Sequence, residues 1–484
     1  MVKNEIRLER INDTTLREGE QTPGVLFKRE ERTKIAEMLS DAIGRKLFLE
    51  IGFAYNELFA SGVASTIKTL GESGRKVKTL LHARCRREDI DVSYKCGSWG
   101  VIVYLPLSDE QLKFKLGKSY EWALAQIKDV ISYAKENVGF ECVEYTLEDM
   151  TAVPRDRAIE GAKTALEAGA DVIRLADTAA RFGPDEFGEA VRKIVEALPE
   201  GTQIDVHCHN DRGLALANAI AGLKAGATGV HTTVLGIGER CGIPDLITLI
   251  ENLESLYNIE TGVKHELIPP IYYYVSACTG IPIPKNHPII GIYARTHKAG
   301  THQVTVLRQL KETGEATTYE TINFSKWGLD REFEFGPMQS EELTKHYLER
   351  YGLDTSNSKE ITERIRKYSM ERGRPLVLRE FREIVKEITG KEILVPAGEE
   401  MMIAIVGMKV EIGADEVSMI REINKVCLKY GATNEIYEVT GSFDYILHLN
   451  NIRDMNEMNS LTNEIRKIKG VSSTETHIVL DYFR

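Results

Sequence analysis

Two histidines separated by a single residue, His207 and His209, carry the sharpest chemical signal in the sequence. They lie in an apolar run typical of a β-strand, where alternate side chains share a face, so both imidazoles point to the same side. Two imidazoles and one carboxylate bind a divalent cation and leave coordination positions for a substrate. Glu18 or Asp13 would supply the carboxylate, and a packed histidine pair is the alternative. The pattern predicts a metal site suited to Mg, Mn, Co or Zn.

Other residues fit the binding of a carbonyl substrate. Arg17 stands beside the acidic residue, and its guanidinium, if aimed at the substrate carbonyl, would stabilise the alkoxide formed when a carbon nucleophile adds. Thr178 either caps the next helix or binds a substrate carboxylate, while Arg174 is interpreted as a structural residue. His297 and His302 lie in Thr-His-Lys-Ala-Gly-Thr-His-Gln, where one could remove a proton from an acidic carbon. A surface loop with two solvated histidines is the other interpretation.

These residues must be positioned by a repeating pattern in which short apolar runs alternate with helical periodicity over residues 7–256. Eight such units in about 250 residues predict a TIM barrel. An open doubly wound sheet is the alternative, but the first strand is followed by Arg-Glu-Gly-Glu-Gln instead of a glycine-rich phosphate turn. The predicted strands are 8–14, 46–53, 77–84, 101–107, 141–147, 171–177, 204–209 and 229–235.

Catalytic residues of a TIM barrel lie at the carboxyl ends of its strands, so the predicted strand ends should meet around one mouth. The chemically informative residues fall at those ends. They are Asp13 to Gln21, Glu50, His82, Arg84, Glu144, Thr146, Glu148, Asp177, Thr178, His207 to Asp211 and Gly236 to Arg240.

The rest of the chain predicts two further parts. A proline-punctuated stretch leads into polar, helix-rich sequence, and residues 401–484 show the strand and helix order βαββαβ of a ferredoxin-like module. We therefore expect a catalytic TIM barrel over 1–265, a linker and helical subdomain over 266–395, and a regulatory α+β domain over 400–484.

Composition excludes several classes of function. A formal charge of −11 offers no general basic surface for nucleic acid, and no apolar run approaches the roughly 18 residues of a membrane span. The seven cysteines are scattered without a CxxC pair, and no signal-like segment opens the chain. We expect a reduced, cytoplasmic protein.

Two segments resemble the signatures of the alpha-isopropylmalate/homocitrate synthase family, the Claisen-condensing branch of the metal-dependent TIM-barrel lyases. The first is Ile-Asn-Asp-Thr-Thr-Leu-Arg-Glu-Gly-Glu-Gln-Thr-Pro-Gly-Val at 11–25, and the second is His-Cys-His-Asn-Asp-Arg-Gly-Leu-Ala at 207–215. The resemblance covers roughly residues 5–305. It implies transfer of the acetyl unit of acetyl-CoA to the keto carbon of a 2-oxo acid, with release of CoA.

The resemblance also implies roles for individual residues. Glu18, His207 and His209 match the metal ligands, and Arg17 matches the essential arginine. The remaining matches are Gln21 and Thr178 for the substrate, and Glu144 and His302, with His297 nearby, for enolisation.

The segment at 108–118, with Ala-Arg-Cys-Arg-Arg at 83–87, is similar to homocitrate synthases and favours 2-oxoglutarate. However, Glu144 and Leu112 stand where lysine-pathway homocitrate synthases carry arginines, so the far carboxylate needs another cation, with His82, Arg84 and Lys113 as candidates. Citrate, citramalate and 2-isopropylmalate synthases are the runners-up.

The C-terminal module resembles the ligand-sensing domain of the Lrp/AsnC regulators, at 437–445 and 471–476. That resemblance implies an amino-acid effector and at least a homodimer, but no helix-turn-helix precedes it. Two other hypotheses are a hydroxyacyl lyase using the same metal and a non-catalytic amino-acid sensor. The lyases usually carry a reactive cysteine after strand eight, and we interpret Cys241 there as coincidental.

Overall fold

The computed structural model describes residues 6–53, 55, 57–393 and 402–478. The chain divides into two compact units, Met1–Val275 and Ser276–Arg484. Our expected boundary at residue 265 falls ten residues before this division. In the described part of the chain, no helix combines the length and apolar character needed to cross a membrane.

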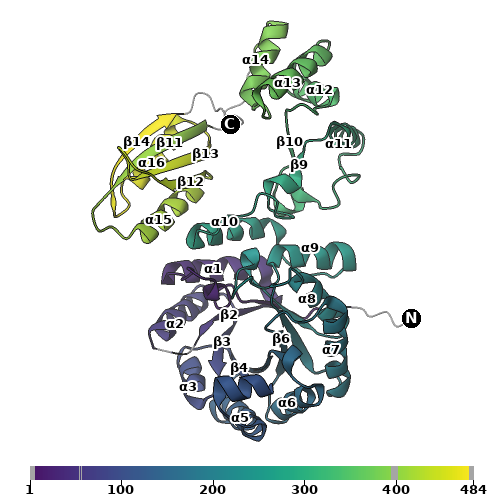
Figure 1. The fold of residues 1–484 in the computed structure, drawn as a ribbon, viewed down its shortest axis with the longest axis vertical. Coiled ribbons are helices and arrows are strands. Elements are labelled where there is room, and N and C mark those ends of the chain that lie inside the picture. The colour runs from purple at the N-terminus through teal and green to yellow at the C-terminus, as the bar shows by residue number, and fades with distance from the viewer. Residues whose placement is uncertain (1–5, 54, 56, 394–401, 479–484) are drawn as a thin grey trace. The chain divides into compact units, whose positions relative to one another are not determined.

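The first unit is a closed barrel of eight parallel strands, as predicted (Figure 1). Its strands are buried on both faces, which is why they read as continuous apolar runs such as Val101, Ile102 and Val103. Each strand pairs with the next, and β1 closes on β8. The strands are β1 Arg10–Asp13, β2 Leu47–Phe53, β3 Lys78–Arg84, β4 Gly100–Pro106, β5 Cys142–Glu148, β6 Val172–Asp177, β7 Gln203–Cys208 and β8 Gly229–Thr232.

Helices surround the barrel and cover the outer face of its strands (Figure 1). One of them, α6, buries small residues such as Ala158, Ala162 and Ala165. The helices are α1 Arg29–Ile43, α2 Glu57–Glu72, α3 Arg87–Lys95, α4 Asp109–Gln111, α5 Tyr120–Ser132, α6 Arg155–Glu167, α7 Pro184–Ala197, α8 Ala215–Lys224, α9 Leu246–Tyr257 and α10 Ile268–Thr279. Short helical turns include η1 Gly19–Gln21, η3 Leu112–Leu116 and η5 Met150–Ala152.

The second unit begins with a helical part built on its own apolar core. Phe335, Phe381 and Ile365 belong to that core, and the rings of Phe335 and Phe381 stack with centroids 4.8 Å apart. Two strands of two residues each pair in parallel, which the sequence did not predict. The elements are β9 Thr296–His297, α11 Gly300–Thr313, β10 Glu332–Phe333, α12 Glu341–Arg350, α13 Ser358–Arg372 and α14 Leu378–Thr389.

The C-terminal domain has the predicted βαββαβ order and a four-stranded antiparallel sheet in the order β12-β13-β11-β14. Along β13, Tyr445, Leu447 and Leu449 are buried at every second position and face helix residues such as Met419 and Ile423. Residues 400, 401 and 479–484 of our expected domain lie outside the described residues. The elements are β11 Met402–Val410, α15 Glu416–Lys429, β12 Thr433–Glu438, β13 Tyr445–Ile452, α16 Met455–Ile465 and β14 Val471–Ile478.

Candidate metal centre and substrate cavity

A cavity of about 230 Å³ opens where the strands of the barrel end. This is the end at which TIM barrels carry their active sites. Most of its lining residues are of polar or charged types. The lining residues are Arg17, Glu18, Gln21, Phe53, Tyr55, His82, Tyr104, Lys115, Thr146, Glu148, Arg174, Ala176, Thr178, His207, His209, Glu239 and Arg240.

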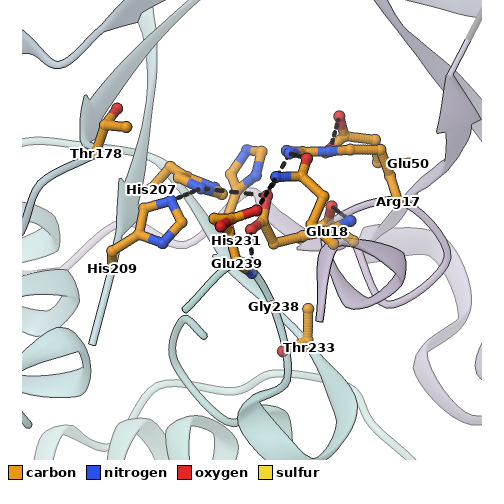
Figure 2. Close-up of polar contacts among 12 residues, drawn as sticks. Arg17, Glu18, Glu50, Thr178, His207, His209, His231, Thr233, Gly238 and Glu239 are labelled. Atoms are coloured by element: carbon orange, nitrogen blue, oxygen red, sulfur yellow. Dashed lines mark hydrogen bonds and ion pairs between the residues drawn. The ribbon is translucent and has the colours of Figure 1, made fainter. Parts of the chain in front are cut away.

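Three side chains that could bind a metal ion meet on one wall of this cavity, as Figure 2 shows. The Nε2 atoms of His207 and His209 lie 3.3 Å apart, and Glu18 Oε2 lies 4.0 Å from His207 Nε2. One ligand atom from each residue falls within 4.8 Å of the other two. All three side chains are buried, so their donor atoms converge where little water competes for them. The donor set fits a divalent cation with open coordination positions.

Burial also prepares the two histidines as ligands. It lowers the pKa of His207 well below its usual value, with neighbouring His209 and His231 adding to the effect, and it lowers the pKa of His209. A neutral imidazole presents the lone pair that a metal ion needs. Both rings therefore remain in the ligating form near neutral pH.

Local backbone structure places Glu18, the third candidate ligand. Glu18 precedes the turn η1, and its backbone N–H donates to the carbonyl of Thr14 at the end of β1. Its Oε1 accepts a 2.9 Å hydrogen bond from the backbone of Glu239. Gly238 allows this approach, because a Cβ there would lie 2.9 Å from Glu18 Cγ (Figure 2). The loop after β8 thus fixes one carboxylate oxygen and leaves the other facing His207.

Arg17 is held beside the metal ligands by a buried carboxylate. Its Nε and Nη2 donate to the two oxygens of Glu50 at 2.7 and 3.0 Å, and its Nη1 donates to Glu18 (Figure 2). Glu50 also lies 2.7 Å from His82 Nδ1. The arginines around Glu50 outweigh its burial and hold its pKa well below the usual range. The guanidinium is therefore fixed in position before any substrate arrives.

Comparisons with known proteins identify the barrel. The profile of the HMGL-like family matches residues 9–275, more than half of the chain. The chain belongs to the HMGL-like family. Homocitrate synthase from Sulfurisphaera tokodaii is 34% identical over 97% of this chain and 98% of its own length. Homocitrate synthase from Sulfolobus acidocaldarius is 33% identical over 97% of each chain.

The remaining comparisons concern the C-terminal domain and the fold. The Lrp/AsnC ligand binding domain matches residues 404–483 of this HMGL-like protein. The hydroxymethylglutaryl-CoA lyase structure from Pseudomonas aeruginosa superposes with a TM-score of 0.51 at 18% identity and covers 58% of this chain and 95% of its own. That similarity supports the barrel fold alone. The predicted enzyme family and the predicted C-terminal module are both confirmed.

Seven of the residues that the sequence assigned to this HMGL-like site line the cavity, whereas Glu144 and Arg84 of the barrel do not. Glu144 is buried deeper along β5, where it accepts a 2.6 Å hydrogen bond from Arg174 Nε. Arg84 is held by Asp89 through contacts of 2.8 Å from both Nε and Nη2. The predicted residues that do line the cavity are Arg17, Glu18, Gln21, His82, Thr178, His207 and His209.

The structure also brings residues to the cavity to which the sequence gave no role. Glu148 follows Glu144 and Thr146 on the inward face of β5 and pairs with Lys115 of η3 at 2.6 Å. Strand alternation places all three β5 residues on the same face. The structure shows that Thr146 and Glu148 line the cavity and that Glu144 does not. Arg174, which we interpreted as structural, also lines the cavity; a buried arginine within a strand has no sequence signal that separates a structural role from a binding one.

His297 and His302 belong to the second unit. His297 is buried, and its Nε2 lies 2.8 Å from Glu320, which Arg331 also binds. The ring of His302 stacks on Tyr319 with centroids 3.8 Å apart, and it lies 6.3 Å from the ring of His297. The structure thus brings the two predicted histidines into one cluster.

A second buried trio, Glu144, Asp205 and His231, also has metal-ligand composition. Its carboxylates are already neutralised: Asp205 binds Arg10 at 3.0 Å and Asn12 at 2.6 Å, while Glu144 binds Arg174. Since a cation there would have to displace two arginines, we interpret this trio as a charge network inside the barrel.

Proposed function

We propose that this protein is a homocitrate synthase, which condenses acetyl-CoA with 2-oxoglutarate and releases CoA. The observation that carries the proposal is the convergence of Glu18, His207 and His209 beside Arg17 in one buried wall. This arrangement is suited to a 2-oxo acid, whose carboxylate and keto oxygens can both be held. The relatives named above are homocitrate synthases matched over nearly their whole length, which supports the substrate.

A divalent cation held by Glu18, His207 and His209 would polarise the keto group of the 2-oxo acid as a Lewis acid. Arg17 stabilises the negative charge that develops on the keto oxygen when the acetyl carbon adds. Thr178 accepts a 3.0 Å hydrogen bond from the backbone of Asp149, which leaves its hydroxyl proton to donate to the substrate carboxylate. Gln21, 3.3 Å from Arg17 Nη1, borders the same position.

Condensation also needs a base that removes a proton from the methyl group of acetyl-CoA. We assign this role to Glu148 instead of Glu144, because Glu148 lines the cavity while Glu144 lies behind Arg174. The Oε2 atom of Glu148 is buried without a hydrogen-bond partner in the described residues, so a lone pair is available. From the second unit we assign a proton-transfer role to His302 and a supporting one to His297, since Glu320 engages the His297 ring.

The substrate is tested by titrating the protein with Mn, Mg, Co or Zn and measuring thiol release from acetyl-CoA. Each assay offers 2-oxoglutarate, oxaloacetate, pyruvate or 2-oxoisovalerate. We expect release with 2-oxoglutarate and homocitrate as product. Thiol release with another acid would indicate a citrate, citramalate or 2-isopropylmalate synthase. No release with any of the four acids would refute the proposal that the protein is a synthase of this kind.

A lyase at the same metal would need its reactive cysteine near the substrate. Cys241 is exposed, and it is not among the residues that line the cavity. Cys241→Ala should therefore leave thiol release unchanged, and a large loss would favour the lyase.

We further infer that an amino acid binds the C-terminal domain and controls the barrel, and that the protein works as a homodimer or larger assembly in the cytoplasm. The Lrp/AsnC match supports the ligand and the pairing of chains, and the seven free cysteines fit a reducing compartment. Thermal shifts of the full chain with each amino acid test the effector, and light scattering tests the assembly. An absence of any shift, or a monomeric mass, would refute the corresponding inference.

A further inference from the structure

The proposed substrate has a second carboxylate, which needs a cation separate from the metal centre. We propose that Arg174 of β6 binds this far carboxylate, with Thr146 of β5 as a second donor, and so makes the site selective for dicarboxylic 2-oxo acids. The inference rests on the proposed function and names the residue that recognises the far carboxylate of its substrate. It replaces our interpretation of Arg174 as structural.

Two unpartnered donors point to a ligand at this position. Arg174 is 1% exposed, yet it lines the cavity, and its Nη2 has no hydrogen-bond partner among the described residues. The same is true of the buried Thr146 Oγ1. The two residues are register partners in the β5–β6 ladder, so their side chains leave neighbouring strands at one level. A buried donor without a partner is costly, and a carboxylate would satisfy both.

The other edges of the guanidinium are already occupied. Arg174 Nε donates to Glu144 at 2.6 Å, and Nη1 lies 3.5 Å from Glu50. Glu50 must also serve Arg17 and His82, so it neutralises Arg174 only in part. Glu144 therefore positions the arginine, and Nη2 remains for the substrate. The family resemblance places an arginine where Glu144 stands, and here the positive charge comes from the neighbouring strand.

Other cations near the cavity are less suitable. Arg84 is engaged by Asp89 and does not line the cavity. Lys115 does line it, but it is paired with Glu148 and its side chain is 44% exposed. His82 is neutral, because burial and Arg17 lower its pKa to about 4.

The test compares 2-oxoglutarate with 2-oxovalerate, which has the same chain with a methyl group in place of the far carboxylate. Binding of each acid to the Mn²⁺-loaded full-length protein is measured without acetyl-CoA, alongside kcat/KM for condensation. We expect Arg174→Met to weaken the binding of 2-oxoglutarate by about 100-fold, the loss typical of removing one partner of a buried charge pair. The affinity for 2-oxovalerate should stay within about threefold of the wild-type value. Arg174→Lys keeps part of the preference, and Thr146→Val reduces it by about tenfold.

Controls separate recognition from stability. The double variant Glu144→Gln/Arg174→Met avoids an unpaired buried carboxylate and should show the same selective loss. Arg10→Met/Asp205→Asn removes a comparable buried ion pair that does not line the cavity, and the ratio of the two affinities should not change. Where neither Arg174 variant folds, Thr146→Val, which removes only a hydroxyl, carries the test.

The outcomes are distinguishable. The inference is overturned if Arg174→Met loses affinity equally for both acids or loses none. It is also overturned if Lys115→Met, and not Arg174→Met, changes the ratio of the affinities for 2-oxoglutarate and 2-oxovalerate. If the wild-type protein prefers 2-oxoglutarate in binding but does not condense it, the proposed function fails while the role of Arg174 stands.

Discussion

Acidification should weaken the metal centre far less than it weakens a pair of histidines exposed to water. Protons compete with a metal ion for the imidazole lone pair, so affinity falls once the pH drops below the pKa of the free ligand. In this protein burial lowers the pKa of both His207 and His209. Their competition with protons therefore begins at lower pH.

The magnitude follows from the ordinary histidine value. With a pKa of about 6.5, each exposed ligand loses about tenfold in availability between pH 7.5 and 5.5, so two of them lose about 100-fold together. Because both pKa values here lie lower, we expect the loss over the same interval to stay below about tenfold. The sign is fixed: affinity falls as the pH falls.

The assay is a titration of Mn²⁺ into the metal-free protein, followed by the electron paramagnetic resonance signal of free Mn²⁺ at both pH values. Circular dichroism confirms that the protein is folded at pH 5.5. His209→Ala should abolish tight binding, whereas His231→Asn, in the second trio, should keep one ion per chain. A loss of 100-fold or more in the wild type would refute the reasoning, because both rings would then titrate as exposed histidines.

Three further predictions concern residues around the centre. Glu50→Gln should lower the free energy of unfolding by about 3 to 5 kcal/mol in urea titrations and reduce kcat, because it takes the counter-charge from two buried arginines. Burial raises the pKa of Asp13 to about 7, above its unfolded value, so the folded state holds the proton more tightly than the unfolded state. The free energy of unfolding should therefore fall by about 1.4 kcal/mol per pH unit between pH 5 and 7. Urea unfolding of Asp13→Asn should lack this decline, and the same slope in the variant and the wild type would contradict the prediction. Gly238→Ala should displace Glu18 and weaken Mn²⁺ binding at least about tenfold, whereas Gly183→Ala, with nothing within 4 Å of the added Cβ, should not.

The sequence was sufficient to predict the barrel and the direction of His207 and His209 because each depends on a short, regular pattern. Buried parallel strands are continuous apolar runs, and their carboxyl ends converge whatever the loops do. His207 and His209 differ by one strand period, so their common direction needs no tertiary information. The spacing left Glu18 and Asp13 open as the carboxylate, and only the family resemblance favoured Glu18.

The height of a residue within the barrel was harder to predict, because the alternation of side chains shows which face a residue occupies but not how far along the barrel it lies. Glu144, Thr146 and Glu148 share one face of β5, and nothing in their spacing shows which of them reach the cavity. Their level depends on the stagger between neighbouring strands, set by pairs such as Thr146 with Arg174. The two-residue strands β9 and β10 were missed for a related reason: a segment that short has no periodicity to detect.

The exchange of charge between β5 and β6 shows how such a site can keep its chemistry while its residues change. A glutamate at position 144 would repel a substrate carboxylate if it faced the cavity alone. In the structure its oxygen accepts a hydrogen bond from Arg174 Nε, so it orients a guanidinium that lines the cavity and whose Nη2 has no hydrogen-bond partner among the described residues. Arg174 thus supplies the positive charge from the neighbouring strand, at the level of Thr146. Residue identity at a single position is therefore a weaker guide to substrate charge than the summed charge of neighbouring strands in the barrel wall.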